Sequence, residues 1–323
     1  MGGFALADLA IAVFKAGGLG FIGSDGNLTN LAAELTKVEE ALDRHNDLLP
    51  IGVGILLFAM KMPAVLEVIQ RFRPRIVWLF AARSIHDYTT WAEEVRRVSP
   101  NSQVWVQIGS VDGALHIAKD VKPDTMCIQG IDAGGHGYEQ GAGIISLLPE
   151  VVDTLAIAGY SHIPLVAAGG IVEGRAAAAA LTLGAQGVVM GTRFLAASET
   201  NVHPEYRRAI LGAKDGGQCT VRSKLFDELR GPNAWPQPYD GRSFRIQSFK
   251  EHAKGVHIDE IRERHSEAIK EDSRGFAADL SGRAATWAGT GVGLVKIEQS
   301  AGDIVESVRH GILVALEAAR SRL

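Results

Sequence analysis

The chain has 323 residues, of which 46% are hydrophobic and 22% charged, so it is long enough to bury a large core and is globular in composition. The formal net charge of -4 comes from scattered side chains without a basic stripe, which argues against nucleic-acid binding. The two cysteines, Cys127 and Cys219, are far apart and lack metal-type spacing, so we expect neither a disulfide framework nor a metal site. A cytoplasmic or other reducing intracellular compartment is the simplest expectation.

The longest apolar run extends from Leu48 to Met60 and is interrupted by Pro50 and two glycines. It is shorter than the roughly 20 residues that a membrane span requires, and no secretory signal precedes it. We therefore interpret the run as a buried strand and expect no association with a membrane.

From Ala5 to about Ala196, short apolar runs alternate with amphipathic stretches of helical period, which is typical of repeated βα units. The pattern predicts strands at 19–23, 51–55, 76–80, 104–108, 125–129, 165–168 and 187–190. It predicts helices at 5–16, 30–45, 63–72, 86–98, 111–119, 144–158 and 172–183. On the second of these helices, the acidic residues are interpreted as a solvated face: Glu34, Glu39, Glu40 and Asp43.

Near-continuous apolar strands joined by helices indicate a parallel sheet that is buried on both faces. Seven strands fit either a doubly wound open sheet or an eight-stranded barrel that lacks one strand. Because Met1-Gly2-Gly3 leads directly into a helix, we expect that the first strand is missing from this chain. We therefore favour an α/β fold of the (β/α)8 TIM-barrel type.

Residues 197–284 break this pattern, because they are rich in charge, proline and histidine and contain several turn clusters. We expect a mostly helical insertion that follows the last strand and covers the barrel mouth as a lid. A helical period returns at 300–323 through Ile304, Val308, Ile312 and Leu316, and it predicts the last barrel helix. The expected barrel domain therefore comprises residues 1–196 and 285–323.

Two strands end in glycine just before a helix, in the segments VAAGGI (166–171) and VVMGTR (188–193). Backbone without side chains lets N–H groups approach an anion at a helix N-terminus, and barrels commonly bind phosphate after their last two strands. The alternative is that each glycine merely ends a strand. The candidate phosphate-binding residues are Ala168, Gly169, Gly170, Met190, Gly191 and Thr192.

The segment QGIDAGGHG (129–137) places His136 among glycines directly after a predicted strand. A histidine at the catalytic face of a barrel is suited to be a general base, whereas most histidines are simply satisfied by hydrogen bonds. We therefore predict His136 as the catalytic residue. We expect Asp132, which precedes it in the loop, to have a structural role.

Gln107 and Gln129 close otherwise apolar strands. A glutamine amide can donate and accept hydrogen bonds, which suits the pyrimidine edge of a flavin. Each of these side chains could equally bind loop backbone, so both interpretations stay open here.

The segments AGGLG (16–20), QGIDAGGHG, AAGGI (167–171), MGTRF (190–194) and WAGTGVG (287–293) occur in the order in which they occur in one family. Together they resemble the nitronate monooxygenases, formerly called 2-nitropropane dioxygenases, over roughly two-thirds of the chain. The resemblance implies a barrel that holds non-covalent FMN and a catalytic histidine at His136. It implies FMN contacts at Met1, Gly2, Gly3, Gln107, Gln129, Gly130, Gly134, Gly135, Ala168, Gly169, Gly170, Met190, Gly191 and Thr192.

The same resemblance implies that an alkyl nitronate is oxidised by dioxygen to a carbonyl compound and nitrite. A nitroalkane would react after His136 removes its α-proton, whereas His136 would only position a substrate that is already anionic. Two other readings stay open: a flavin-dependent NAD(P)H oxidoreductase, such as a quinone or enoyl reductase, and an inactive flavin-binding barrel.

One departure concerns the N-terminus. In the family, a strand precedes the methionine that borders the flavin, and Met1 takes that place here. A missing strand would leave the edges of its neighbours unpaired. Three explanations stay open: a partner chain fills the gap, as in a homodimer; the chain is a truncated form; or the fold is compromised.

Overall fold

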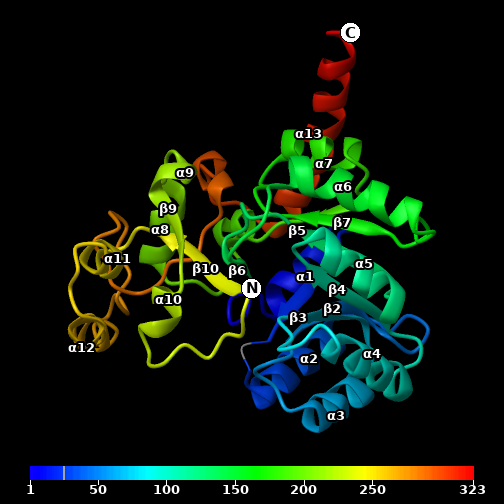
Figure 1. The fold of residues 1–323 in the computed structure, drawn as a ribbon, viewed down its shortest axis with the longest axis horizontal. Helices are drawn as coiled ribbons and strands as arrows, with labels where there is room; N and C mark the ends of the chain where they lie inside the picture. The colour runs from blue at the N-terminus through cyan, green and yellow to red at the C-terminus, as the bar shows by residue number, and fades with distance from the viewer. Residues whose placement is uncertain (25) are drawn as a thin grey trace.

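The computed structural model describes residues 1–24 and 26–323. Seven parallel strands form one curled sheet in the order β1-β2-β3-β4-β5-β7-β8, and helices pack along its outer side (Figure 1). The strands are β1 (Phe21–Gly23), β2 (Leu49–Leu56), β3 (Pro74–Phe80), β4 (Gln103–Ile108), β5 (Thr125–Gln129), β7 (Leu165–Ala168) and β8 (Gly187–Val189). The predicted parallel α/β sheet is thus confirmed.

Helices of the predicted βα units alternate with these strands. They are α1 (Ala7–Lys15), α2 (Leu28–Ala41), α3 (Met62–Phe72), α4 (Asp87–Val98), α5 (Val111–Asp120), α6 (Ile144–Ile157) and α7 (Gly174–Thr182). The last helix, α13 (Ala301–Arg320), packs between α7 and α1, which is the position of the final helix of a barrel.

The contact between α7 and α13 is close because it is made by glycines. A Cβ atom on Gly174 would lie 2.3 Å from the carbonyl carbon of Gly311, so the two backbones approach without intervening side chains. Ile304 and Val308 are buried as their spacing predicts, whereas Leu316 is 42% exposed. Figure 1 shows why: the second half of α13 extends beyond the sheet.

The described strands leave β1 and β8 as the two edges of the sheet, each paired on one side only. This is the arrangement expected of a barrel in which one strand is absent. The first residues of the chain lie at the carboxyl end of this gap. The Gly3 N–H donates to the Gly23 carbonyl at 3.3 Å, and a Cβ on Gly191 would lie 3.7 Å from the Met1 sulfur.

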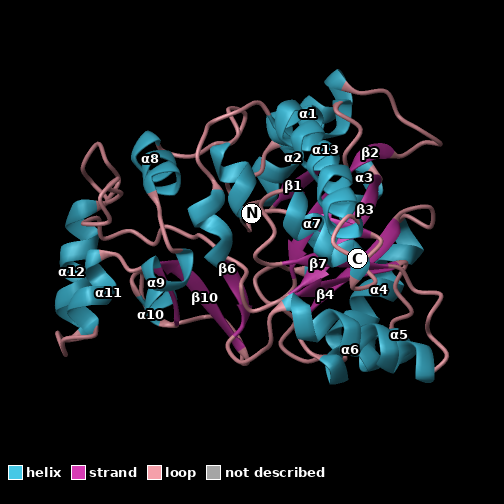
Figure 2. Ribbon diagram, turned by 90° about the horizontal axis from the view of Figure 1, so that it is seen from above, coloured by secondary structure: helices cyan, strands magenta, loops and turns pink. Residues whose placement is uncertain are grey.

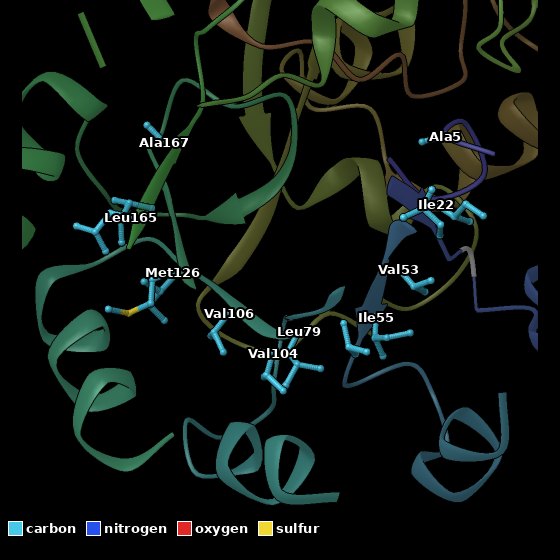
Figure 3. Close-up of a cluster of buried hydrophobic side chains, with 14 of the residues drawn as sticks. Ala5, Ile22, Val53, Ile55, Leu79, Val104, Val106, Met126, Leu165 and Ala167 are labelled. Atoms are coloured by element: carbon cyan, nitrogen blue, oxygen red, sulfur yellow. The ribbon is translucent and has the colours of Figure 1, made fainter. Parts of the chain in front are cut away.

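Side chains of alternate residues along each strand enter two different clusters, as the two-residue period of a strand requires. One set packs outward against the helices and forms the main core (Figure 3). The members labelled in Figure 3 are Ala5, Ile22, Val53, Ile55, Leu79, Val104, Val106, Met126, Leu165 and Ala167.

The other set fills the concave face of the sheet, and here aromatic rings supply much of the volume. Phe21 contacts Trp78 edge to face with ring centroids 5.1 Å apart, and its centroid is 5.6 Å from that of Trp105. Large rings therefore occupy an interior that branched aliphatic side chains fill in most barrels of this type.

A second lobe lies beside the barrel sheet and has its own hydrophobic cluster (Figure 2). Its three-stranded antiparallel sheet has the order β6-β10-β9. The strands are β6 (Gly135–Tyr138), β9 (Thr220–Ser223) and β10 (Tyr239–Phe244). The helices are α8 (Pro204–Gly212), α9 (Gly216–Cys219), α10 (Leu225–Glu228), α11 (Gln247–His252) and α12 (Ile258–Ala268).

Two features of this lobe differ from the sequence analysis. The end of the predicted glycine-rich loop is a strand, since β6 begins at Gly135 and pairs with β10. The segment 197–284, expected to be mostly helical, also contains strands β9 and β10. Both strands are short and carry charged residues, so no apolar alternation marks them.

The two ends of the chain between Ala197 and Gln299 are held together. Ala197 and Gln299 form a parallel bridge, the Ser198 N–H donates to the Gln299 carbonyl at 3.0 Å, and the Gln299 N–H donates to the Ala196 carbonyl at 3.2 Å. The chain therefore leaves the barrel and returns to it at one place.

Glu34 departs from the interpretation of a solvated acidic face on α2. Its side chain is buried and accepts a hydrogen bond of 2.8 Å from the Ala7 N–H, at the start of α1. Lys37 pairs with the other carboxylate oxygen at 2.6 Å. Glu34 on α2 thus caps the N-terminus of α1, where the first N–H groups lack partners within the helix.

Neither cysteine is in a disulfide, and burial raises the pKa of both the Cys127 and the Cys219 thiols. Within residues 1–24 and 26–323, no helix is both long and apolar enough to cross a membrane. The same residues contain no cluster of three or more histidine, cysteine or acidic side chains that could hold a metal ion.

Candidate active site

The predicted site residues come together because their strands are parallel and end at the same edge of the sheet. Gln107 lies near the end of β4, Gln129 ends β5, Ala168 ends β7, and Met190 follows β8. His136 lies on β6, which follows β5 after the glycine-rich loop. Residues separated by more than 80 positions thus share one face of the barrel.

The two glutamines are in different environments. The Gln129 amide nitrogen donates to the His136 carbonyl at 3.1 Å, which matches the alternative of binding to loop backbone. Its Oε1 accepts no hydrogen bond from the described residues and lies 2.7 Å from where a Gly137 Cβ would be. The Gln107 side chain is buried and makes no hydrogen bond with any described residue. Both amides therefore keep hydrogen-bonding capacity that the protein does not use.

The loop after β7 bends sharply at two glycines. Gly169 has φ +102° and Gly170 has φ +74°, conformations that side-chain-bearing residues rarely adopt. A Cβ on Gly169 would lie 2.7 Å from the Gly130 carbonyl oxygen, and the Gly130 N–H donates to the Ala168 carbonyl at 2.9 Å. The loops after β5 and β7 are therefore packed backbone to backbone.

Backbone N–H groups remain free at this place. Among the residues that the structure describes, neither the Gly170 N–H nor the Gly191 N–H donates to any group. The Thr192 hydroxyl accepts from the Gly289 N–H at 3.0 Å, which leaves its own hydrogen available as a donor. These donors lie near Asp132, since a Cβ on Gly170 would be 3.8 Å from the Asp132 Cγ, and one oxygen of that carboxylate is bound by the Thr290 hydroxyl.

Asp132 has the structural role that the sequence analysis expected. Its Oδ1 accepts from the Thr290 hydroxyl at 2.9 Å, and its carbonyl accepts from the Thr290 N–H at 3.0 Å. The neighbouring Gly134 packs directly on the returning chain, since a Cβ there would lie 2.4 Å from the Ala288 carbonyl carbon. The segment 287–293 thus braces the loop that precedes His136.

The N-terminal residues lie against the same edge. Met1 is 37% exposed and its side chain lies next to Gly191, while Gly2 lies near Gly23 at the end of β1. The structure therefore brings Met1, Gly2 and Gly3 to the same region as the loops after β7 and β8.

His136 is the centre of a compact arrangement of side chains. Its Nε2 lies 2.6 Å from the Asp227 Oδ1, and the side chains are 17% and 7% exposed. The Trp235 ring stacks on the imidazole with centroids 3.6 Å apart and an interplanar angle of 7°, and Trp287 lies 4.8 Å away. Asp227 was not predicted, because it lies 91 residues from His136 and has no motif around it.

An aromatic wall continues from this arrangement across both lobes. The Trp235 ring lies 4.6 Å from that of Phe58, and the Tyr239 ring lies 5.3 Å from those of Phe80 and Tyr138. Burial raises the pKa of the Tyr239 and Tyr138 hydroxyls, so both stay protonated near neutral pH. Apart from Asp227, the side chains in contact with the His136 ring are therefore aromatic.

The opposite face of the small sheet carries a buried ion pair that the sequence analysis missed. Arg222 on β9 binds Asp240 on β10 through its Nε at 2.6 Å, and only 9% of the Arg222 side chain is exposed. Burial raises the pKa of the Asp240 carboxyl although the guanidinium opposes this shift. The Arg222 Nη1 is buried and has no hydrogen-bond partner among the described residues.

Comparison with known proteins identifies the chain as a whole. The sequence profile of the nitronate monooxygenase family matches residues 1–311. The chain is 42% identical over 311 residues to nitronate monooxygenase npaC of Metarhizium robertsii, covering 93% of this chain and 86% of that protein. It is 40% identical over 328 residues to a nitronate monooxygenase of Neurospora crassa, covering 94% of this chain and 84% of that protein.

Two solved structures share the fold at lower identity. FabK from Thermotoga maritima superposes with a TM-score of 0.78 at 24% identity, covering 100% of this chain and 94% of that one. Nitroalkane oxidase from Streptomyces ansochromogenes gives a TM-score of 0.76 at 23% identity, with 98% and 95% covered. These likenesses agree with the barrel architecture, and the sequence relationships show that the chain belongs to the nitronate monooxygenase family of flavin-dependent oxidoreductases.

Proposed function

We propose that this protein oxidises alkyl nitronates, and nitroalkanes after deprotonation, to carbonyl compounds and nitrite, with FMN as cofactor and dioxygen as oxidant. The observation that carries the proposal is the position of His136, an imidazole stacked on Trp235 in the lobe that adjoins the edge of the barrel sheet where the unused N–H groups of Gly170 and Gly191 lie. Its two sequence relatives named as nitronate monooxygenases support the same reaction class.

The unused donors fit a flavin phosphate. The Gly170 and Gly191 N–H groups have no acceptor among the described residues, and glycine leaves room for an anion to approach them. The Thr192 hydroxyl can add one more hydrogen bond. We expect these three residues, with Ala168, Gly169 and Met190 beside them, to hold the phosphate.

The polar groups at the ends of β4 and β5 fit the ring system. Gln107 and the Gln129 Oε1 are free to bind the pyrimidine edge, whose N–H and carbonyl groups need both acceptors and donors. The Arg222 guanidinium lies on the Gln129 side of the small sheet, since a Cβ on Gly137 would be 2.7 Å from the Gln129 Oε1 and 3.5 Å from the Arg222 Nη2. We expect its buried, unpartnered Nη1 to be a further donor toward the ring. We expect Gly130, Gly134, Gly135, Met1, Gly2 and Gly3 to contribute backbone around the ring.

When bound, FMN would supply the redox chemistry by taking up an electron from the nitronate. The protein contributes a base, an apolar enclosure and orientation. His136 accepts the α-proton of a nitroalkane, whose C–H electron pair moves into the new C=N bond of the nitronate. The wall formed by Trp235, Phe58 and Tyr239 keeps water away from this step. We propose that segment 197–284, which supplies Trp235 and Tyr239, acts as the lid of the site.

Anaerobic mixing with propyl-2-nitronate and, separately, with NADPH tests the proposal. Flavin absorbance between roughly 350 and 500 nm reports cofactor reduction directly. Bleaching by the nitronate alone, followed by nitrite release when air is admitted, is the expected result. Bleaching by NADPH only would refute the proposal and favour a reductase, and a protein that binds no flavin would refute both.

A further inference from the structure

The partner of His136 is an aspartate from a distant part of the chain. Asp227 lies on α10, in the segment between the last barrel strand and the last barrel helix, and its Oδ1 is 2.6 Å from the His136 Nε2. A distance this short is typical of a hydrogen bond that involves a charged group. The contact joins the strand that carries His136 to the lid.

Apart from the contact with His136, no hydrogen bond of the described residues explains why the Asp227 side chain is buried. Its side chain is 7% exposed, and its Oδ2 is buried without a hydrogen-bond partner in the described part of the chain. Burying a carboxylate with a single partner costs stability that an apolar residue would not cost. Among the described residues, His136 is the one hydrogen-bond partner of the Asp227 side chain, so we relate its burial to its effect on that imidazole.

The other contacts fix the ring without using its nitrogen atoms. Trp235 stacks on one face, Trp287 lies at an angle to the ring, and the facing residue of β10 is Gly241. A neutral imidazole carries one hydrogen, and a carboxylate can only accept. A neutral imidazole that donates to this carboxylate would carry its hydrogen on Nε2 and its lone pair on Nδ1, which no described residue contacts by a hydrogen bond.

We propose that Asp227 is a positioning residue that sets the tautomer of His136, so that Nδ1 is the nitrogen that takes the α-proton of a nitroalkane. This inference rests on the proposed function. In the step, the substrate C–H bond breaks, its electron pair forms the C=N bond of the nitronate, and the proton binds Nδ1. The imidazolium that results is stabilised by the Asp227 carboxylate at Nε2.

The other charges around His136 are already paired, so they do not compete for this role. Asp240, on the neighbouring strand, is bound by Arg222, and Glu139, at the end of β6, is bound by Lys224 at 2.8 Å. Asp227 alone among these carboxylates contacts the imidazole.

The test compares a substrate that needs a base with one that does not. We would prepare Asp227→Asn, which keeps the shape and removes the charge, and Asp227→Ala. The control is Glu228→Gln, the same kind of change one residue along α10. Each variant is assayed with 2-nitropropane and with pre-formed propyl-2-nitronate, and its thermal midpoint is measured.

We expect kcat with 2-nitropropane to fall at least about tenfold in both Asp227 variants, as loss of a base's orienting group requires. Turnover of propyl-2-nitronate should change less than about threefold, since no proton is removed from it. The control should match the wild type on both substrates. Equal losses on both substrates, or no loss on either, would overturn the inference.

A spectroscopic measurement does not depend on turnover. In protein labelled with ¹⁵N-histidine, we expect a slowly exchanging imidazole proton on the Nε2 of His136, assigned by its absence in His136→Gln. It should disappear in Asp227→Ala. A proton found on Nδ1 instead would overturn the inference. If the wild type oxidises neither substrate, the proposed function fails, whereas the position of this proton still decides the tautomer.

Discussion

At Gly191, we expect a substitution to weaken ligand binding while leaving the stability of the fold almost unchanged. Its φ of -101° is ordinary for any residue, and a Cβ there would meet only Met1 side-chain atoms at 3.7 and 3.8 Å, which is normal van der Waals contact. Gly191→Ala should therefore change the free energy of unfolding of the apoprotein by less than about 1 kcal/mol. By contrast, Gly169→Ala would place a Cβ 2.7 Å from the Gly130 carbonyl oxygen and disturb the loop itself.

The same Cβ would occupy the space beside the free Gly191 N–H, where we expect the FMN phosphate. Loss of one hydrogen bond to a charged group costs about 1.5–3 kcal/mol, which corresponds to a roughly 10- to 150-fold rise in Kd. Titration of apoprotein by flavin fluorescence measures this change. Riboflavin lacks the phosphate, so its affinity should be almost the same in Gly191→Ala and the wild type.

The matched control is Gly212→Ala, an exposed glycine at the end of α8 with no atom within 4 Å of the added Cβ. It should bind FMN as the wild type does. If Gly191→Ala binds FMN with unchanged Kd, or weakens riboflavin as much as FMN, the phosphate does not lie at Gly191 and the reasoning is wrong.

Two further predictions concern stability. Glu34→Ala removes the acceptor of the buried Ala7 N–H, so the free energy of unfolding in urea should fall by about 1–3 kcal/mol. Glu34→Gln keeps an acceptor and should lose less. An unchanged midpoint in Glu34→Ala would contradict the capping role. Hydrogen bonds from Arg283, which outweigh the opposing effect of burial, lower the pKa of Glu251 from 4.5 to about 2. A carboxyl group whose pKa is lowered by folding stabilises the fold at pH values above its unfolded pKa. The wild type should therefore have a higher free energy of unfolding than Glu251→Gln, and this difference should shrink as the pH falls from 4.5 toward 2. A difference in unfolding free energy that stays constant over this range would count against the ion pair.

The barrel strands could be predicted because they are apolar runs, and those inside the sheet, such as β4 and β5, are buried on both faces. Some starts differ by two residues. The predicted start of β1 is residue 19, but Leu19 is 45% exposed and the strand begins at Phe21. Strands β2 and β3 begin at Leu49 and Pro74, two residues before the predicted 51 and 76. Strands β9 and β10 could not be predicted, since β10 pairs with β6, far away in the sequence, and β9 pairs with β10. Short strands rich in charge carry no periodic signal of their own.

The site residues that lie in a sequence motif could be predicted, whereas those that join the site only through a long-range contact could not. His136 and the loops after β7 and β8 stand out as glycine-rich segments after strands, and the structure brings them to one edge. Whether they bind FMN stays a prediction. Asp227 and Arg222 carry no local signal, because an acidic or basic residue in a charged segment is most often solvated. Both are buried only in the folded structure, where Asp227 contacts His136 on β6 and Arg222 contacts Asp240 on β10.

The bridge between Ala197 and Gln299 has a consequence for how the protein can change. Because the chain between Ala197 and Gln299 starts and ends at one bridged point, we expect that residues can be added or removed between these ends without altering the barrel's geometry. Not every part of this chain should tolerate such changes, because β10 pairs with β6 and α10 carries Asp227. Length variation should therefore be tolerated best around α11 and α12, which lie farthest from the barrel in Figure 2.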